Sequence, residues 1–165
     1  MKRILALLIF TTACGGGDAT GSNFPALAGS YGATFTVAFS NAIETGSSSV
    51  PGTLTLGSPS NSGAFSGSYI ITGGGSGTIA GTVRTDGGIS ISEFGDPNAD
   101  PLESLQILQN EFFWCDFAFA AGSPMSGSIS GGSLYLTGGI SVPCNYVNPT
   151  QTVASTISVT INGSR

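Results

Sequence analysis

The strongest constraint on this chain is a two-residue alternation of apolar and polar side chains. In residues 31–40, the large apolar residues share one face and small polar residues share the other, as in a half-buried β-strand. The alternation recurs along the chain, and glycine-rich turns separate most of its segments. The predicted strands lie within residues 31–40, 52–57, 63–72, 77–84, 88–94, 112–120, 125–130, 133–141 and 152–161.

Short strands joined by tight turns must run antiparallel, because parallel neighbours need long crossovers. An open sheet of this size would leave two unpaired edges, and closure removes them. We therefore predict an all-β fold, a single antiparallel up-and-down β-barrel of about eight or nine strands, with a β-sandwich as the alternative. Asp100, Pro101 and Glu103 form a helix-start pattern, which predicts one short helix of two to three turns through residue 108. The alternative is an irregular loop with an edge strand.

The N-terminus has the layout of a secretory signal, with Lys2 and Arg3 before an apolar run that is too short to span a bilayer. Residues 11–14, Thr-Thr-Ala-Cys, resemble the lipobox of bacterial lipoproteins, although Thr11 replaces the usual leucine. This resemblance implies lipidation of the Cys14 sulfur and cleavage just before it. The alternative is an ordinary signal peptide with a chance cysteine. We expect a signal peptide over 1–13, a flexible Gly/Ser-rich tether over 14–25 and a barrel domain over 26–165.

The lipoprotein resemblance also implies a location. Such a chain is held in the cell envelope by membrane lipid and faces the periplasm or the cell exterior. Gly15 stands where an aspartate would favour retention in the inner membrane, so the outer membrane is favoured if the host has two. We expect a monomer.

The other two cysteines, Cys115 and Cys144, are predicted to form a disulfide. An exported chain meets conditions in which disulfides persist, and three cysteines leave one pair once Cys14 carries lipid. The alternative is two buried free thiols. The absence of histidine and of a C-x-x-C spacing argues against zinc.

Two glycine- and aromatic-containing stretches carry a short resemblance to known barrels. Residues 63–69, GAFSGSY, resemble a strand of the avidin-like barrels, and residues 29–35, GSYGATF, resemble the opening strand of lipocalins and avidins with Tyr31 in place of tryptophan. The resemblance implies a barrel of the kind that carries small ligands. It does not imply biotin binding, because this chain has a single tryptophan, Trp114, rather than several.

Charge and composition limit the function classes. The chain has four Lys and Arg against nine Asp and Glu, a formal net charge of −5, and no basic patch for nucleic acid. It has no histidine for proton transfer, and nothing in the sequence brings Glu93 and Asp116 together as a catalytic carboxylate pair. We expect a protein that is not an enzyme and needs no cofactor. Arg84 ends a predicted strand and is expected to face solvent or a nearby carboxylate.

The sharpest local motif is acidic. Asp96, Asn98 and Asp100 alternate as oxygen ligands do in calcium loops, so they are the candidate metal ligands. The pattern departs from an EF-hand, since Pro101 and Ile107 stand where a glycine and a glutamate are needed. The alternative is a turn with a helix cap.

Two functions remain open at this point. The first is a lipocalin-like carrier that binds a small apolar ligand inside the barrel, and the second is a structural or adhesive surface protein with a filled core. An eight-stranded barrel has room for either arrangement. The inward aromatic residues that would fill the core or line a pocket are Phe35, Phe39, Phe65, Tyr69, Phe117 and Phe119.

Overall fold

The computed structural model describes residues 23–95, 113–115, 125–147 and 150–165, and these residues form strands and turns only. Among them, no helix is long and apolar enough to cross a bilayer. The short helix predicted after Asp100 lies outside the described residues. The strands are β1 (Gly29–Ser40), β2 (Thr45–Leu56), β3 (Ala64–Ile71), β4 (Ser76–Val83), β5 (Gly88–Gly95), β6 (Phe113–Cys115), β7 (Met125–Ser130), β8 (Ser133–Val147) and β9 (Thr150–Ser164).

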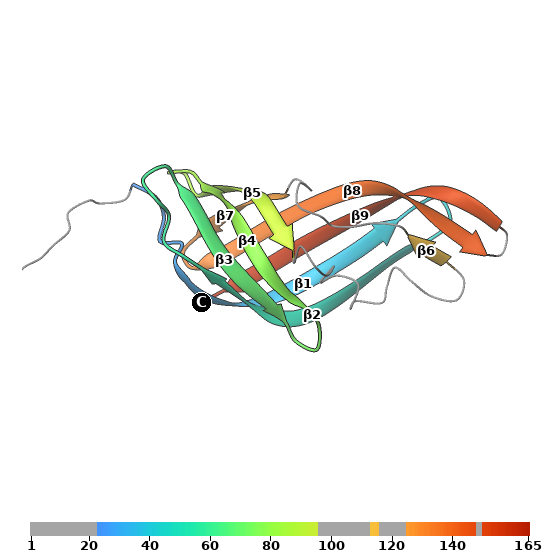
Figure 1. Cartoon of the computed structure of the whole chain (residues 1–165), viewed down its shortest axis with the longest axis horizontal. Coiled ribbons are helices and arrows are strands. Elements are labelled where there is room, and N and C mark those ends of the chain that lie inside the picture. Colours follow the sequence, from blue (N-terminus) through green and yellow to red (C-terminus); the bar gives the residue numbers. More distant parts are fainter. Residues whose placement is uncertain (1–22, 96–112, 116–124, 148–149) are drawn as a thin grey trace, which may run out of the picture.

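Eight of these strands close into an antiparallel up-and-down barrel, as the alternation predicted (Figure 1). Each strand from β1 to β4 pairs with the next strand in the chain, and β5 pairs with β7. β7 then pairs with β8, and β8 pairs with β9. The pairing of β9 with β1 closes the ring. These two strands therefore satisfy each other's backbone groups along this pairing. The barrel is therefore correct and the sandwich alternative is not.

The strands differ in length, and this shapes the molecule. β8 and β9 have 15 residues each and β1 and β2 have 12, whereas β3, β4 and β5 have 8 and β7 has 6. β3 pairs only with the last five residues of β2, from Gly52 to Leu56. The four long strands thus continue past the closed barrel as a curved sheet (Figure 1). The short β6 pairs with Cys144–Tyr146 of β8 beyond the end of β7.

The inward faces are those that the alternation predicted. Tyr31, Ala33, Phe35, Val37 and Phe39 of β1 are all buried. The inward residues of the other strands add leucine, isoleucine, valine and aromatic side chains to one continuous core. Removing this much apolar surface from water is the main force that stabilises the fold.

Aromatic rings fill the space that inward glycines leave. Tyr69 stacks on Phe94 with ring centroids 4.6 Å apart and meets Phe35 in a tilted contact at 5.8 Å. Tyr69 stands opposite Gly77 across the β3–β4 pair, where a side chain would collide with the tyrosine ring. Phe35 covers Gly52 of β2 in the same way. The glycines are therefore part of a packed interior rather than open space.

The segment before β1 lies across one end of the barrel. Leu27 is fully buried, and its carbonyl accepts a hydrogen bond of 2.6 Å from the hydroxyl of Tyr31. The guanidinium of Arg165 donates to the carbonyls of Ala26 and Ala28 at 2.6 Å each and lies 5.3 Å from the Tyr31 ring centroid. Arg165 thus holds the segment that precedes β1 in place through these contacts.

Candidate functional site

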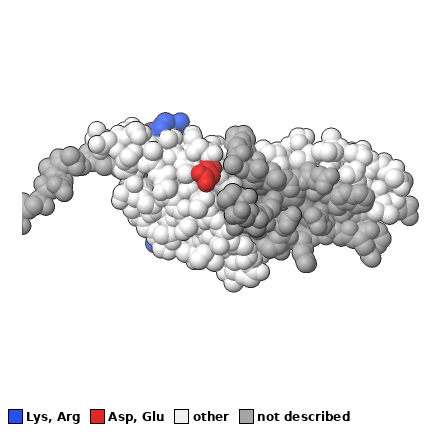
Figure 2. Space-filling model, in the orientation of Figure 1, with Lys and Arg blue, Asp and Glu red and all other residues white. Residues whose placement is uncertain are grey.

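The outer face of the barrel is covered by small hydroxyl side chains. One row runs in register across five neighbouring strands, with Ser126, Thr137, Thr160, Thr36 and Ser49 side by side. Within this row Thr36 and Ser49 hydrogen bond at 2.8 Å, and Thr137 and Thr160 at 3.3 Å. On the face that Figure 2 shows, few charged groups interrupt the surface of the described residues. This row therefore offers hydrogen-bonding hydroxyls and contains no charged side chain.

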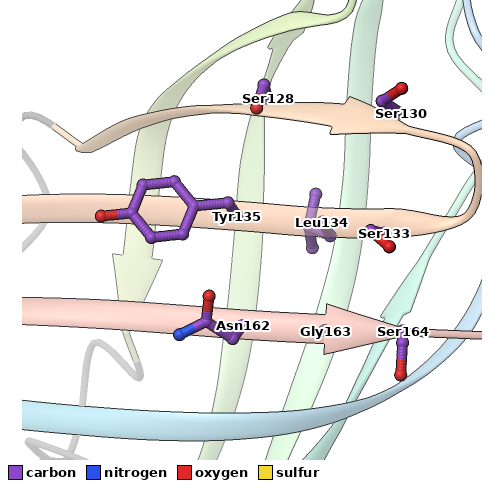
Figure 3. A pocket seen from close by; sticks show the side chains of 8 residues that line it. All are labelled: Ser128, Ser130, Ser133, Leu134, Tyr135, Asn162, Gly163 and Ser164. Atoms are coloured by element: carbon purple, nitrogen blue, oxygen red, sulfur yellow. The ribbon is translucent and has the colours of Figure 1, made fainter.

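A shallow groove of about 390 Å³ lies on this outer face across β7, β8 and β9. In register, Ser128 stands opposite Tyr135, and Tyr135 stands opposite Asn162. The Tyr135 ring lies along β8 between the other two side chains (Figure 3) and is 46% exposed. The groove is lined by Ser128, Ser130, Ser133, Leu134, Tyr135, Asn162, Gly163 and Ser164.

A second groove, of about 420 Å³, lies where β3 and β4 meet the end of β5. Its polar lining is similar, with Ser68, Ser76 and Thr78, but its exposed apolar side chain is the aliphatic Ile70, which is 61% exposed. Tyr69 also borders it from the core side. The two grooves thus match in size and differ in whether an aromatic ring is open to solvent.

A hydrogen-bonded cluster joins the β1–β2 turn to β8 and β9. The amide nitrogen of Asn41 donates to the Tyr146 hydroxyl at 2.7 Å and to the Ser155 hydroxyl at 2.9 Å. Its oxygen accepts from the backbone N–H groups of Ile43 at 2.9 Å and Glu44 at 3.0 Å. All the hydrogen-bonding positions of this amide are therefore used.

Ser155 and Tyr146 extend the cluster into the inner face. Ser155 is 1% exposed, the one buried polar side chain among the described residues. The Tyr146 hydroxyl donates to Oε1 of Glu44 at 2.8 Å. Burial raises the pKa of Tyr146; the hydrogen bond from Asn41 opposes this rise, and the Glu44 carboxylate adds to it. At neutral pH the tyrosine is protonated, and the cluster links the β1–β2 turn to β8 and β9.

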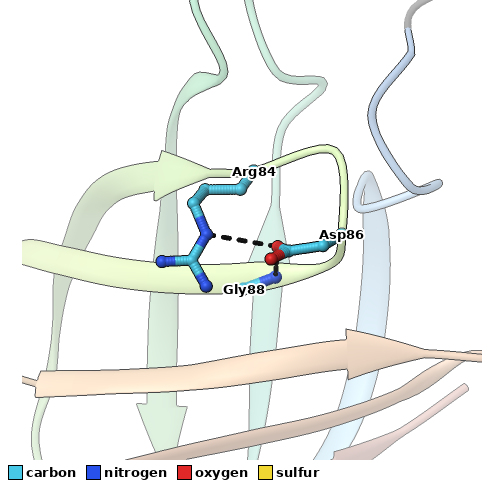
Figure 4. Close-up of polar contacts among 3 residues, drawn as sticks. All are labelled: Arg84, Asp86 and Gly88. Atoms are coloured by element: carbon cyan, nitrogen blue, oxygen red, sulfur yellow. Dashed lines mark hydrogen bonds and ion pairs between the residues drawn. The ribbon is translucent and has the colours of Figure 1, made fainter.

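Arg84 forms part of a turn. Just after β4, its Nε lies 3.2 Å from Oδ1 of Asp86, and both side chains are exposed (Figure 4). The N–H of Gly88 donates to the same oxygen at 2.8 Å. This backbone hydrogen bond, together with the Arg84 guanidinium, lowers the pKa of Asp86. The expectation that Arg84 meets a nearby carboxylate is confirmed.

The acidic candidates are placed as follows. Glu93 lies exposed on β5 and accepts a hydrogen bond of 3.1 Å from Thr78 on β4. Asp116, the other carboxylate considered as a catalytic candidate, lies outside the described residues. The same holds for the calcium candidates Asp96, Asn98 and Asp100. In the part of the chain that the structure describes, no group of three metal-ligating side chains gathers.

The structure describes two of the three cysteines for which a role was predicted. Cys14 lies outside the described residues. Cys115 of β6 stands directly opposite Cys144 of β8 in the antiparallel register, and Cys144 is buried. Directly opposed residues of antiparallel strands have Cα atoms about 4.5–5.5 Å apart, within the range that a disulfide spans. The backbone arrangement is thus compatible with the predicted disulfide, which stays a prediction.

Sequence reasoning missed the polar cluster and the outer groove. Asn41 and Glu44 gave no motif, because they contact Tyr146 and Ser155 only through the closure of β1 on β9. The outward position of Tyr135 could have been predicted from the sequence. Its neighbours Leu134 and Leu136 are buried, and the alternation of a strand then places Tyr135 on the outer face. An outward aromatic in a Ser- and Thr-rich strand was the available signal.

Comparison of the chain with protein-family models, with curated proteins and with solved structures finds no match.

Proposed function

We propose that this protein is a lipid-anchored, non-catalytic binding protein of the cell envelope that meets its partner with the outside of a filled β-barrel. The observation that carries this proposal is the occupied interior. Tyr69, Phe35 and Phe94 contact one another in the barrel, and the glycines beside them are covered by rings. Such packing leaves binding to the exterior.

The exterior supports the same interpretation. The row of serine and threonine side chains on the outer face contains no charged residue. The partner is therefore recognised by hydrogen bonds and shape rather than by long-range electrostatic attraction. Among the described residues, the large exposed apolar side chains are the scattered Ile43, Ile70, Tyr135 and Val147. Scattered single residues do not form the broad apolar patch that a protein–protein interface often uses.

The proposed anchor fits the position of the chain ends. Phe24 packs against the core and Arg165 holds the carbonyls of Ala26 and Ala28, so the chain enters the barrel at the end where the C-terminus also lies (Figure 1). Ten residues from Cys14 onward reach at most about 35 Å. With lipid on Cys14, the long strands and β6 would point away from the membrane.

A small-ligand carrier is the second candidate. An eight-stranded barrel is a fold that ligand carriers use. On the inner side of the long strands, Val50, Ile140, Val142 and Val153 are only partly buried. An apolar ligand of the carrier would lie against this part of the sheet.

Native mass spectrometry of the full chain, purified from its own host, separates the two candidates. The proposed function predicts the mass of the polypeptide and its lipid alone, whereas a co-purifying apolar molecule would favour the carrier. Lipidation is tested separately by growing cells with an alkyne-tagged palmitate. The label should enter the natural chain and be absent from Cys14→Ser, and equal labelling of both would refute the anchor.

A further inference from the structure

The groove across β7, β8 and β9 has the surface chemistry of a sugar site. Tyr135 is the single aromatic ring among the large exposed apolar side chains of the described residues. A tyrosine ring offers a flat apolar face beside a polar hydroxyl. The C–H groups on one side of a sugar ring make the same kind of flat apolar surface, so the two can stack.

Hydrogen-bonding groups lie on both sides of that ring. Ser128 on β7 and Asn162 on β9 are the direct cross-strand neighbours of Tyr135, and both are exposed (Figure 3). A serine hydroxyl donates and accepts, and an asparagine amide does both through separate atoms. These are the partners that sugar hydroxyls need, since each sugar hydroxyl also donates and accepts.

The lining restricts the ligand to a neutral one. None of the residues that line the groove carries a charge. The nearest described cation, Arg165 at the end of β9, has its guanidinium engaged by the carbonyls of Ala26 and Ala28 and by the Tyr31 ring. An anionic ligand would therefore lose hydration without gaining a charged partner.

The walls of the groove are held by backbone pairing. They are strands of the closed barrel, and β7 joins β8 through Gly131 and Gly132, both with positive φ, of 56° and 85°. The Arg165 N–H donates to the Gly132 carbonyl at 3.3 Å, which ties this turn to the end of β9. The groove is shallow, has a volume of about 390 Å³ and is open to solvent.

We infer that this groove binds a neutral saccharide, with one sugar ring stacked on Tyr135 and its hydroxyls paired with Ser128 and Asn162. This inference rests on the proposed function, in that it names the class of partner for the exterior of the barrel. The groove beside Ile70 provides the internal comparison, because it has a similar size and polarity and lacks an exposed ring.

The test is a calorimetric titration of the full chain, in a detergent without a sugar headgroup, with maltose, cellobiose, chitobiose and the acidic comparator glucuronate. We expect saturable binding of at least one neutral disaccharide and none of glucuronate. Tyr135→Ala should weaken binding by about tenfold or more, as the loss of one stacked ring implies. Ile70→Ala, which alters the other groove, should leave the affinity within about threefold. Tyr135→Phe, which keeps the stacking ring, should lose less affinity than Tyr135→Ala.

Asn162→Ala is the second variant if Tyr135→Ala does not fold, as judged by circular dichroism, and it should also weaken binding. The inference is overturned if no neutral disaccharide binds, or if Ile70→Ala weakens binding as much as Tyr135→Ala does. Its failure is distinguishable from that of the proposed function. The sugar inference fails alone when neither sugar nor an internal ligand is found, whereas a co-purifying apolar molecule in the native mass spectrum overturns the proposed function.

Discussion

The packing of rings over inward glycines gives the sharpest stability prediction, and Gly52 of β2 is the position to change. A Cβ atom built on Gly52 would lie 2.7 Å from Cε2 of Phe35 and would also collide with the backbone carbonyl of Ile70. A flexible side chain could move aside, but the carbonyl belongs to the paired strand β3 and cannot. Gly52→Ala should therefore force a shift of the backbone or of the Phe35 ring.

The magnitude follows from two opposing effects. Alanine in a strand is favoured over glycine by roughly 0.5–1 kcal/mol, because it loses less backbone freedom on folding. Overpacking a filled site costs roughly 1–3 kcal/mol, and the collision with backbone places Gly52 in the upper part of that range. Gly32 of β1 is the matched control, since it faces outward and its nearest neighbour would lie 3.9 Å from the new Cβ. Because the gain for alanine applies to both variants and cancels, the overpacking cost alone makes Gly52→Ala about 2 kcal/mol less stable than Gly32→Ala.

The assay is urea unfolding of both variants followed by circular dichroism, with thermal unfolding as a second readout. A difference of this size should also separate the two Tm values by roughly 4–8 °C for a domain of about 150 residues. Adding Phe35→Leu to Gly52→Ala should recover part of the loss, giving a coupling of at least about 0.5 kcal/mol. If Gly52→Ala and Gly32→Ala are equally stable, the interior at Gly52 has free space and the argument for a filled barrel is wrong.

Three further predictions concern the long strands. Asn41→Ala should destabilise the fold by about 1–3 kcal/mol because it removes two hydrogen bonds to part-buried hydroxyls. Asn145→Ala, which removes one solvent-exposed hydrogen bond with Thr152, is the control, and an equal effect of the two substitutions would contradict this. Burial raises the pKa of Tyr146, so the unfolded chain ionises first and urea midpoints should fall as pH rises above about 10. Tyr146→Phe should flatten that fall, and an unchanged slope would argue against the buried hydroxyl. In urea without reductant, thiol alkylation followed by mass spectrometry should leave Cys115 and Cys144 unmodified, and modification of both would disprove the disulfide.

The sequence was sufficient to predict the barrel because its pattern is local. Inward and outward faces of β1 could be assigned directly, since Tyr31 to Phe39 alternate without interruption and all their inward members are buried. Glycine turns at residues 73–75 and 131–132 predicted antiparallel pairing of neighbours, and the edges that would remain predicted closure. Neither step needs knowledge of contacts between distant parts of the chain.

Where the pattern is interrupted, the sequence was not sufficient. The β4–β5 pairing shifts register between Ala80 and Gly81, which leaves Ser92 and Glu93 both exposed and turns Phe94 inward. A strict two-residue period would place Glu93 with the inward isoleucines and Phe94 outside. The bulge that reverses them brings Phe94 onto Tyr69, a contact that no local pattern indicates.

The candidate sites were even harder to predict from the sequence. The groove needs the registers of two consecutive hairpins, β7–β8 and β8–β9, which the alternation alone does not specify. The Asn41 cluster joins positions more than 100 residues apart. Polar residues in such clusters carry no periodicity, so only the three-dimensional arrangement distinguishes them from ordinary turn residues.

The central claim is that the barrel is closed around a filled core, and xenon binding tests it most directly. Empty apolar cavities in proteins take up xenon, so crystals of the full chain pressurised with the gas would report free space in the interior. The account predicts no xenon site among Phe35, Tyr69 and Phe94. Ordered xenon between these rings would show that the barrel holds a cavity and would return the function to an internal ligand.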